Sequence, residues 1–336
     1  MSLDIANTNE DISFMGGRLV FINGEYFPES EAKISIFDSA LMFGDMVFEM
    51  TRSFNKQQFK LREHIKRLYD GIKILRIPIR ISIEEMENIC YKVIEKNEPY
   101  FSNTDEHRLM INVSRGPLAI YKQIFTGQLT PTIVIADFPL KWTVVGMGKL
   151  FDIGINAVIP SQRAIPSVLL EPKIKNRSRI HYQMANIEVS HWKGDNNWAL
   201  LLDSDGFIAE GTGDNFFIIK NNVIITPEGR NILRGISREY IFELADELNI
   251  HWVEKNIEPY DVYTADEAFM TATPFCILPV TSLNNITIGN GIIGKVTKIL
   301  IEQWSFNVGV DIVAQIKTFN AETDSHIDGP TPYTFK

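Results

Sequence analysis

Hydrophobic and polar residues alternate with two different periods along this chain, and both periods occur in each of two blocks. In the first block, alternating apolar residues on both sides of Asn23-Gly24 predict a β-hairpin over Arg18–Phe27, because Asn-Gly readily adopts the positive φ angles of a tight hairpin turn. A second hairpin is predicted from Val47–Phe54, which returns through Gln58–Leu61 across the Asn55-Lys56 turn. The first block therefore begins as antiparallel sheet.

Helical periods follow these hairpins. Apolar residues recur at helical spacing over Glu63–Leu75, which predicts an amphipathic helix. Ser82 and Glu85 have the spacing of a capping box, and the helix that they open is expected to run through Ile94. The strands Arg108–Ser114 and Thr132–Asp137 complete the block.

A segment with proline and glycine, residues 139–148, is the predicted linker to the second block. That block is predicted to hold strands Gly154–Pro160, Ala199–Leu202, Phe216–Ile219, Val223–Ile225, Trp252–Asn256 and Glu267–Thr271, and helices Ile180–His191, Ser237–Leu248 and Gly294–Trp304. Strands that alternate with helices predict an α/β or α+β fold in two domains, over residues 18–138 and 149–320. Residues 1–17 are expected to form an arm and residues 321–336 a tail.

Composition narrows the class of protein. The chain has 336 residues, of which 45% are hydrophobic and 22% charged, enough for two cores. A net charge of -9 disfavours a nucleic acid or an anionic membrane as partner. No apolar run is long enough to span a membrane, and the acidic, polar N-terminus does not resemble a signal peptide. Two cysteines, Cys90 and Cys276, cannot form a disulfide framework, so a reduced, cytoplasmic protein is expected.

The stretch from Glu210 to Arg238 carries candidate chemistry at both ends. Glu210 precedes a glycine-flanked turn, and Gly235-Ile236-Ser237 opens a predicted helix. The free amide groups at the beginning of a helix bind anions, and phosphate in particular. The expected ligand therefore has a phosphate at one end and, at the other, a group that binds a carboxylate. Pyridoxal phosphate has this shape.

Two other signals are weaker. Gly289–Val296 resembles a phosphate-binding loop, but Val296 replaces the Ser or Thr that would hold Mg²⁺, and Asn284-Asn285 just before it predicts a hairpin turn. His64 and His251 have no partner at ligand spacing, so no metal site is expected.

Five motifs together resemble the fold-type IV pyridoxal-phosphate enzymes, which include the branched-chain and D-amino-acid aminotransferases and aminodeoxychorismate lyase. They are Phe43-Gly44-Asp45-x-Val47-Phe48-Glu49, His64-x-x-Arg67-Leu68, Glu210-Gly211-x-x-x-Asn215-Phe216, Gly235-Ile236-Ser237-Arg238 and Asp266-Glu267-x-Phe269-x-x-x-Thr273. They follow the family's order between Ile34 and Val280. The resemblance implies a small α+β N-terminal domain, a larger C-terminal domain on a β-barrel-like core, pyridoxal phosphate as cofactor, and a homodimer with a shared active site.

The same resemblance assigns the cofactor residues. Lys175 is the Schiff-base lysine, because its offset from Glu188 in the following helix matches the family, whereas that of Lys173 does not. Glu210 keeps the pyridine nitrogen protonated. The phosphate ligands are Arg67, the turn formed by Gly235, Ile236 and Ser237, and the hydroxyl of Thr273.

Each assignment has a plain structural alternative. Lys175 could be a solvated lysine in the basic loop Lys173–Arg179, Glu210 a strand-end carboxylate, and Arg67 a member of a surface salt bridge. Ile236-Ser237 could be a simple helix cap and Thr273 a loop cap.

The substrate residues are less well defined. Phe48 occupies the position of a pocket aromatic residue in the family, or it packs in the core, and Arg108 occupies that of a pocket arginine in branched-chain enzymes. Ala272 is placed beside the substrate. Arg177 or Arg179 is expected either to bind a substrate carboxylate or to form a salt bridge.

The sequence departs from the family pattern in two places. The loop Gly116–Lys122 lacks the Arg-x-His pair with which D-amino-acid aminotransferases bind a carboxylate. Ser178 replaces a frequent Asn after the lysine, and Tyr182 lies beyond the position of the tyrosine that bonds the cofactor's ring oxygen in branched-chain enzymes.

The expected function is a transaminase that moves an amino group between an amino acid, branched-chain-like, and a 2-oxo acid through a Lys175 aldimine. An aminodeoxychorismate-lyase-type enzyme, favoured by Arg179, is the first alternative. A D-amino-acid or (R)-amine transaminase, and a protein that keeps the fold without catalysis, are the others.

Overall fold

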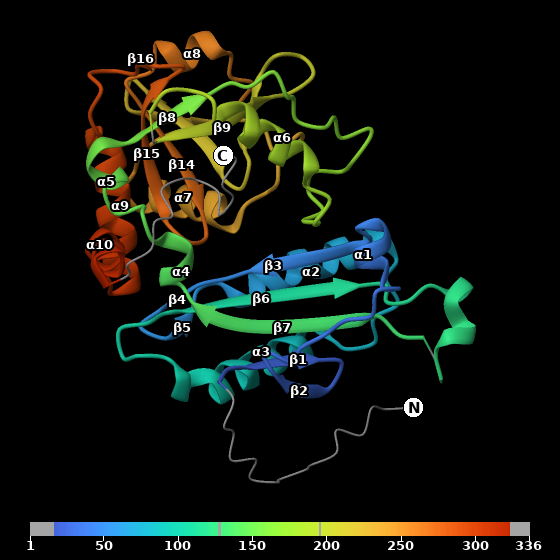
Figure 1. Ribbon diagram of the computed structural model, residues 1–336. Helices are drawn as coiled ribbons and strands as arrows, with labels where there is room; N and C mark the ends of the chain where they lie inside the picture. The colour runs from blue at the N-terminus through green and yellow to red at the C-terminus, as the bar shows by residue number, and fades with distance from the viewer. Residues whose placement is uncertain (1–16, 127–128, 195, 323–336) are drawn as a thin grey trace. The chain divides into compact units, whose positions relative to one another are not determined.

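The computed structural model describes residues 17–126, 129–194 and 196–322. The chain divides into two compact units, Met1–Pro139 and Leu140–Lys336, and the elements of each are labelled in Figure 1. The division falls at the beginning of the segment predicted as a linker, while the domain limits themselves stay a prediction. This segment contains the short helix α4 (Lys141–Val144). Two of its residues, Leu140 and Val144, have buried side chains.

In the described residues, the first unit is an antiparallel sheet of five strands in the order β2-β1-β7-β6-β3. These strands are β1 Leu19–Ile22, β2 Glu25–Pro28, β3 Met46–Met50, β6 His107–Ser114 and β7 Thr132–Pro139. The helices are α1 Ser39–Phe43, α2 Leu61–Leu75 and α3 Ile83–Asn97, with 3₁₀ turns at Glu98–Tyr100 and Ala119–Ile124. Helices α2 and α3 pack on the sheet and on each other. The predicted capping box of Ser82 and Glu85 is confirmed, and so is the Asn23-Gly24 hairpin.

The prediction of a second hairpin is wrong in its extent. Strand β3 ends at Met50 and pairs with β6, which offers a longer partner than the local return of the chain. Only β4 (Ser53–Phe54) and β5 (Gln57–Gln58) pair across the turn, and Leu61 already begins α2. The carboxylate of Glu106 stabilises this turn by accepting the backbone N–H groups of Asn55 (2.8 Å) and Lys56 (3.0 Å).

The second unit is built on a ring of six strands among the described residues. The ring consists of β8 Ile155–Val158, β9 Asn197–Leu202, β10 Ile208–Gly211, β11 Asn215–Lys220, β14 Glu267–Ala272 and β15 Cys276–Leu283. Its order is β10-β9-β8-β15-β14-β11, and an additional pairing of β10 with β11 closes it. The predicted barrel-like core is therefore confirmed.

Shorter strands and helices surround this ring (Figure 1). They are β12 Val223–Thr226, β13 Trp252–Glu254, β16 Ile286–Thr287, α5 Leu150–Ile153, α6 Ile180–Val189, α7 Ile236–Glu247, α8 Pro259–Tyr263, α9 Lys295–Val308 and α10 Ile312–Glu322. Helix α6 packs on β9 and helix α7 on β14.

Helix α10 corrects the prediction that the chain's last helix ends near Trp304. Helix α9 extends to Val308 and ends at Gly309, whose φ of 67° turns the chain. In α10, the side chains of Ile312, Ile316 and Phe319 are buried, and their spacing is helical. The tail predicted from residue 321 therefore begins inside this helix, while its remainder and residues 1–16 of the predicted arm lie outside the described residues.

The loop that resembles a nucleotide-binding motif has another role. Gly294 precedes α9, and the carboxylate of Glu267 accepts the N–H groups of Val296 (2.9 Å) and Thr297 (2.8 Å). A phosphate at this helix terminus would compete with that carboxylate. The predicted hairpin turn at Asn284-Asn285 is confirmed by the pairing of β15 with β16.

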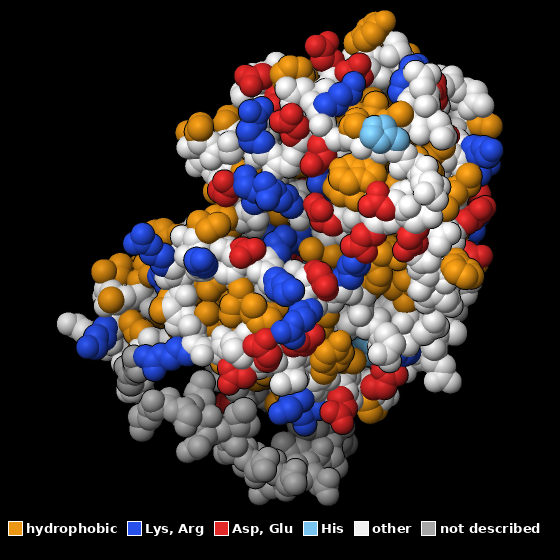
Figure 2. All heavy atoms as spheres, turned by 180° about the vertical axis from the view of Figure 1, so that it is seen from behind, with side chains coloured by type: hydrophobic (Ala, Val, Ile, Leu, Met, Phe, Trp, Pro, Cys, Tyr) orange, Lys and Arg blue, Asp and Glu red, His pale blue; other side chains and the backbone are white. Residues whose placement is uncertain are grey.

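Cys90 and Cys276 are both buried, and neither belongs to a disulfide among the described residues. No helix within residues 17–126, 129–194 and 196–322 is long and apolar enough to cross a membrane. In the same residues no group of three potential metal ligands occurs. On the face shown in Figure 2, basic and acidic side chains are interspersed.

A buried acid–base chain lies on the helix-covered face of the first unit's sheet. The Nδ1 atom of His107 lies 2.8 Å from Asp137 and its Nε2 atom 2.5 Å from Glu98. Burial alone would lower the pKa of His107, but the hydrogen bonds and charges of Asp137 and Glu98 outweigh it and raise this pKa. Burial also raises the pKa of Asp137. Both groups therefore hold protons more tightly in the folded protein.

We expect Asp137→Asn to destabilise the protein by about 3 kcal/mol near about pH 6, because it removes one partner of a buried ion pair. A raised folded-state pKa means that the stabilisation is complete below the ordinary histidine value of about 6.5 and is lost as pH rises through the folded value. The difference from wild type should therefore shrink by about pH 9 in urea unfolding. The exposed acid variant Glu25→Gln is the control, and an Asp137→Asn difference that does not change with pH would contradict the assignment.

Candidate functional site

The predicted site residues divide between the two units. The first unit contains Phe48, Arg67 and Arg108. The second contains Lys175, Arg177, Arg179, Glu210, Gly235, Ile236, Ser237, Ala272 and Thr273. Most of the predicted cofactor residues therefore belong to the second unit.

Glu210 lies at the seam that closes the six-stranded ring. It pairs with Asn215 across β10 and β11, and this is the pairing that joins the two ends of the ring. Its side chain is 5% exposed and accepts hydrogen bonds from the Tyr182 hydroxyl (2.7 Å), the Asn215 amide (3.2 Å) and the Leu233 N–H (3.0 Å). The predicted pyridine acid is thus a buried, hydrogen-bonded carboxylate, which argues against a plain strand-end residue.

The electrostatics around Glu210 leave room for a cation. Burial raises the pKa of Glu210, although the Tyr182 hydroxyl, the Leu233 N–H and the charges of Arg179 and Lys175 oppose this shift. Because burial prevails over these donors, another positive charge beside the carboxylate would stabilise its ionised form. A protonated heteroaromatic nitrogen is such a charge.

Lys175 lies in the segment between β8 and α6, where its ammonium group interacts electrostatically with Glu210. It is half-buried. Lys173, the other lysine of this segment, donates to the Arg230 carbonyl (3.1 Å) and pairs with Glu171 (2.5 Å). Lys173 is thus engaged with Arg230 and Glu171, whereas the charge of Lys175 acts on Glu210. The contacts therefore favour the same lysine, Lys175, as the offset from Glu188 does.

Helix α7 begins beside Glu210. Its N-cap residue, Gly235, has no side-chain oxygen to accept the first helical amides, and Ser237 is buried in the first turn. The φ of Gly235 is −71°, so positive φ does not explain this glycine. A Cβ atom there would lie 2.2 Å from Oδ1 of Asn215, so close packing is the reason. Both α7 and α9 follow a glycine without a capping side chain, but Glu267 accepts the first amides of α9, whereas within the described residues no side chain accepts those of α7. Helix α7 therefore has the free amides that a phosphate site requires.

One face of the sheet connects these groups. Asn215 lies opposite Thr271, so the two side chains share a face, and further along it Phe217 stacks on Phe269 at 4.8 Å. Phe242 of α7 also contacts Phe217, so α7 covers this face. The Thr271 hydroxyl is buried without a hydrogen-bond partner in the described structure. A buried, unsatisfied donor beside Asn215 is consistent with a polar ligand.

Residues at the end of β14 and near α6 complete the second unit's group. Ala272 ends β14 and Thr273 follows it in the turn, and both are half-buried. Arg177 is exposed. Arg179 donates to the Thr212 carbonyl, and its guanidinium lies 4.6 Å from the centre of the Tyr182 ring.

Tyr182 and Asn215 both donate hydrogen bonds to Glu210, and neither has a role predicted from the sequence. Asn215 stands within a quoted motif, and the hairpin pairing of Glu210 with Asn215 follows from the short turn between them. Tyr182 gives no such signal, because its contact depends on how α6 packs on the barrel.

In the first unit, Arg67 is fixed by a buried carboxylate. Both oxygens of Glu49 accept from the Arg67 guanidinium, at 2.6 Å and 2.8 Å, and His64 lies 2.8 Å from the same carboxylate. Burial opposes ionisation of Glu49, but the charges and hydrogen bonds of Arg67 and His64 prevail and lower its pKa. Arg67 is therefore held in place within its own unit by an ion pair whose carboxylate is buried.

Phe48 and Arg108 share the opposite face of that sheet. Phe48 pairs with Asn112 in the register of β3 and β6, and Arg108 lies 3.8 Å from the sulfur of Met50. Strand alternation places all four side chains on the face away from Glu49 and α2. Phe48 and Arg108 are both buried.

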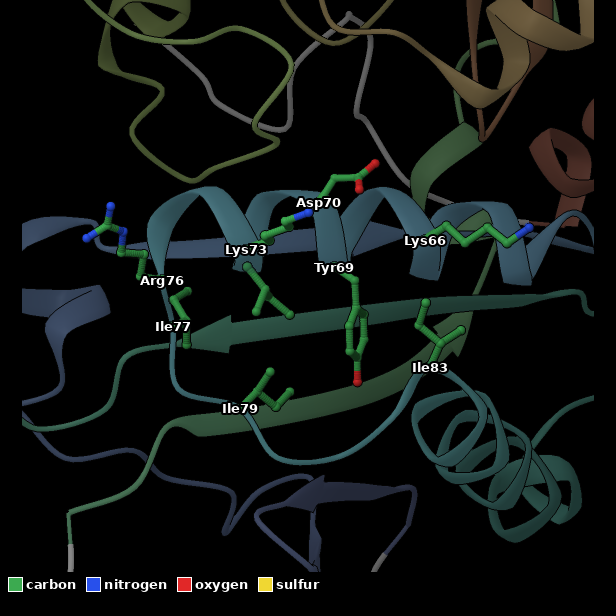
Figure 3. A pocket seen from close by; sticks show the side chains of 9 residues that line it. Lys66, Tyr69, Asp70, Lys73, Arg76, Ile77, Ile79 and Ile83 are labelled. Atoms are coloured by element: carbon green, nitrogen blue, oxygen red, sulfur yellow. The ribbon is translucent and has the colours of Figure 1, made fainter.

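A hollow of about 550 Å³ lies elsewhere in the first unit, between α2 and the segment before α3 (Figure 3). Its wall includes Tyr69, Ile72, Ile77, Ile79 and Ile83. None of the residues that line it is a predicted site residue.

The second unit's arrangement fits pyridoxal phosphate. An uncapped helix terminus, a buried carboxylate in need of a cation and an amine near that carboxylate match the phosphate, the ring nitrogen and the aldehyde of this cofactor. The fold and these residues define a fold-type IV pyridoxal-phosphate enzyme.

Comparisons with known proteins agree. The family profile described as "Amino-transferase class IV" matches residues 46–283. A putative branched-chain-amino-acid aminotransferase of Methanocaldococcus jannaschii is 35% identical and covers 85% of this chain and 94% of its own length. The branched-chain-amino-acid aminotransferase of Escherichia coli K12 is 31% identical, over 83% of this chain and 89% of the relative. The crystal structure of the Escherichia coli enzyme superposes with a TM-score of 0.77, at 28% identity, over 93% of this chain and 97% of that one.

The chain therefore belongs to the class IV aminotransferases. It is an enzyme that uses pyridoxal phosphate.

We expect Gly235→Ala to cost about 2 kcal/mol of stability, because the new Cβ overlaps Oδ1 of Asn215 and displaces the amide that bonds Glu210. Cofactor retention during dialysis should fall as well. Gly213→Ala is the matched control, since the nearest atom to its Cβ, on Arg179, is 4.0 Å away. Equal unfolding midpoints and equal retention in the two variants would refute the packing explanation.

Proposed function

We propose that this chain transfers the amino group of a branched-chain amino acid to a 2-oxo acid. The observation that carries the proposal is the buried Glu210 at the barrel seam, whose pKa the charge of Lys175 lowers. Support for the substrate class comes from relatives named branched-chain-amino-acid aminotransferase at 31% and 35% identity. One solved neighbour at 27% identity, a branched-chain amino acid aminotransferase, is complexed with N-(5'-phosphopyridoxyl)-L-glutamate.

Each residue has a defined task in this reaction. The bound cofactor supplies an aldehyde carbon and an electron-withdrawing ring. Glu210 holds a proton at the ring nitrogen, and Tyr182 fixes the orientation of Glu210. Lys175, once its amine is neutral, would accept a proton from the substrate's α-carbon and deliver it to the carbon that the cofactor's aldehyde supplies. The amides of Ile236 and Ser237 bind phosphate.

Several predicted residues stay proposals. Arg67 of the first unit and Thr273 are proposed to add phosphate contacts, and Phe48, Arg108 and Ala272 to contact substrate. For Arg179, the bond to the Thr212 carbonyl favours a role near the cofactor ring over binding of a substrate carboxylate. Arg177 is exposed, which favours a salt bridge.

Two alternative reactions can be separated from the proposed one. A D-alanine aminotransferase of Bacillus licheniformis is 30% identical over 83% of this chain and 93% of the relative. The loop Gly116–Lys122 lacks the Arg-x-His pair, which favours the branched-chain reaction. A lyase of the aminodeoxychorismate type would release pyruvate from aminodeoxychorismate without an amino acceptor, and this assay separates it from a transaminase.

A donor screen tests the proposed function. The holoenzyme is mixed with L-valine, L-leucine, D-alanine or an (R)-amine, and the change of cofactor absorbance to that of pyridoxamine phosphate is recorded. We expect the L-branched-chain donors to react fastest, and 2-oxoglutarate or pyruvate to reverse the change. Reaction with D-alanine alone would overturn the substrate assignment.

Lys175→Ala should lower turnover by at least about a thousandfold, because it removes the proton-transferring amine. Borohydride should fix the cofactor to the wild-type peptide that contains Lys175, whereas this label should be absent from the variant. Lys173→Ala, whose side chain bonds Arg230 and Glu171, should stay within about twofold of wild type. A label that maps away from Lys175 would contradict the assignment.

We also propose a homodimer. Large apolar side chains on and just before α1 are exposed, with exposed fractions of 46% to 67% for Ile34, Ile36, Leu41 and Phe43. Such a group on one short segment is typical of an interaction surface. The cytoplasmic location predicted from the cysteines stays a prediction.

Leu41→Asp should weaken the dimer by about 30-fold or more, the effect of losing a contact worth about 2 kcal/mol. Light scattering during size-exclusion chromatography should report a dimer for wild type and for the control Ile286→Asp, which changes an exposed residue of the second unit. A wild-type protein that is monomeric at micromolar concentration would exclude the proposal.

A further inference from the structure

A second carboxyl group lies beside Glu210. Asp214 is in the turn between β10 and β11, which the Gly211 N–H closes by donating to the Asp214 carbonyl (3.0 Å). The Asp214 side chain folds back over Gly211. A Cβ atom on Gly211 would lie only 2.0 Å from Oδ1 of Asp214. The glycine next to Glu210 therefore provides the space that this carboxyl group occupies.

The two carboxyl groups are satisfied very differently. Glu210 accepts three hydrogen bonds, from Tyr182, Asn215 and Leu233. The Oδ1 atom of Asp214 is buried and has no hydrogen-bond partner among the described residues. Because hydrogen-bond donors stabilise the ionised form of an acid, the negative charge belongs on Glu210 and a proton on Asp214.

The charged and titratable neighbours agree with this distribution. Burial first, and then the charge of Glu210, raise the pKa of Asp214 to about 8, while the Gly213 N–H and the charge of Arg179 oppose the shift. Burial and the charges of Glu210 and Asp214 raise the pKa of the Tyr182 hydroxyl, so this group stays protonated. Besides Arg179, Lys175 is a charged group that acts on Glu210.

We propose that Asp214 keeps its proton in the cofactor-free protein and releases it when a protonated pyridine ring binds beside Glu210. Asp214 is in this sense a positioning residue of the pocket around Glu210 that receives the ring nitrogen. The O–H bond of Asp214 breaks, the proton passes to solvent, and no electrons are transferred. The positive charge of the bound ring offsets the negative charge of Glu210, and this negative charge is one of the causes that keep Asp214 neutral. The inference rests on the proposed cofactor chemistry.

The test uses binding of pyridoxine 5'-phosphate, which has no aldehyde and cannot bond to Lys175, to the cofactor-free protein. Calorimetry near about pH 7.5, in buffers of different ionisation heat, counts the protons released. Wild type should release up to about one more proton per site than Asp214→Asn. Between about pH 7 and about pH 8, the wild-type affinity should rise by up to about tenfold more than that of the variant.

The exposed acid variant Asp205→Asn is the control and should keep the wild-type proton count. Infrared difference spectra of wild type provide a measurement that needs no variant, since the band of a protonated carboxyl group should disappear when the ligand binds. Equal proton counts in wild type and Asp214→Asn, or no loss of that band, would overturn the inference and leave the proposed function intact. Failure of wild type to bind pyridoxine 5'-phosphate would overturn both.

Discussion

The pairing of Glu210 with Asn215 closes the barrel and at the same time places an acid at its seam. A carboxylate buried at such a point is costly unless its oxygens are satisfied. Its donors come from three separate segments, namely Tyr182 of α6, Asn215 of β11 and Leu233 before α7. The acid is therefore fixed only when all three segments have packed together. Closure of the barrel and preparation of the cofactor site are one structural event, and a change that loosens the seam should affect both.

The protein satisfies several of its otherwise unpaired amide groups with its own acids. Glu267 occupies the beginning of α9, and Glu106 binds the amides of the turn between β4 and β5. Helices α7 and α9 both follow a glycine, Gly235 or Gly294, whose Cβ would overlap a neighbouring side chain. The difference is that Glu267 reaches the first amides of α9, whereas within the described residues no side chain accepts from those of α7. The first amides of α7 are therefore the ones proposed to bind a ligand.

The sequence predicts the local features of this fold well and its long-range pairings poorly. The Asn23-Gly24 turn and the Ser82 capping box depend only on neighbouring residues, and both predictions are confirmed. The second hairpin is wrongly predicted because β3 pairs with β6, which is distant in sequence. Strand β15 is missed, and it contains Pro279, a residue that argues against a central strand; α10 is overlooked although its apolar spacing is visible. In the site, motif positions identify Glu210, whereas Tyr182 can be found only from the packing of α6.

The contacts of Arg179 fit a different role from the binding of a substrate carboxylate. The charges of Arg179 and Lys175 both lower the pKa of Glu210, and in the proposed reaction Lys175 must lose its charge in order to accept a proton. An arginine does not deprotonate in proteins. Arg179 is held by the Thr212 carbonyl and lies over the Tyr182 ring, so its charge stays near Glu210 and Asp214 while that of Lys175 changes. In the proposed reaction, a permanent cation at this place would favour the ionised form of Glu210 even while Lys175 is neutral, which a second lysine would not do as reliably.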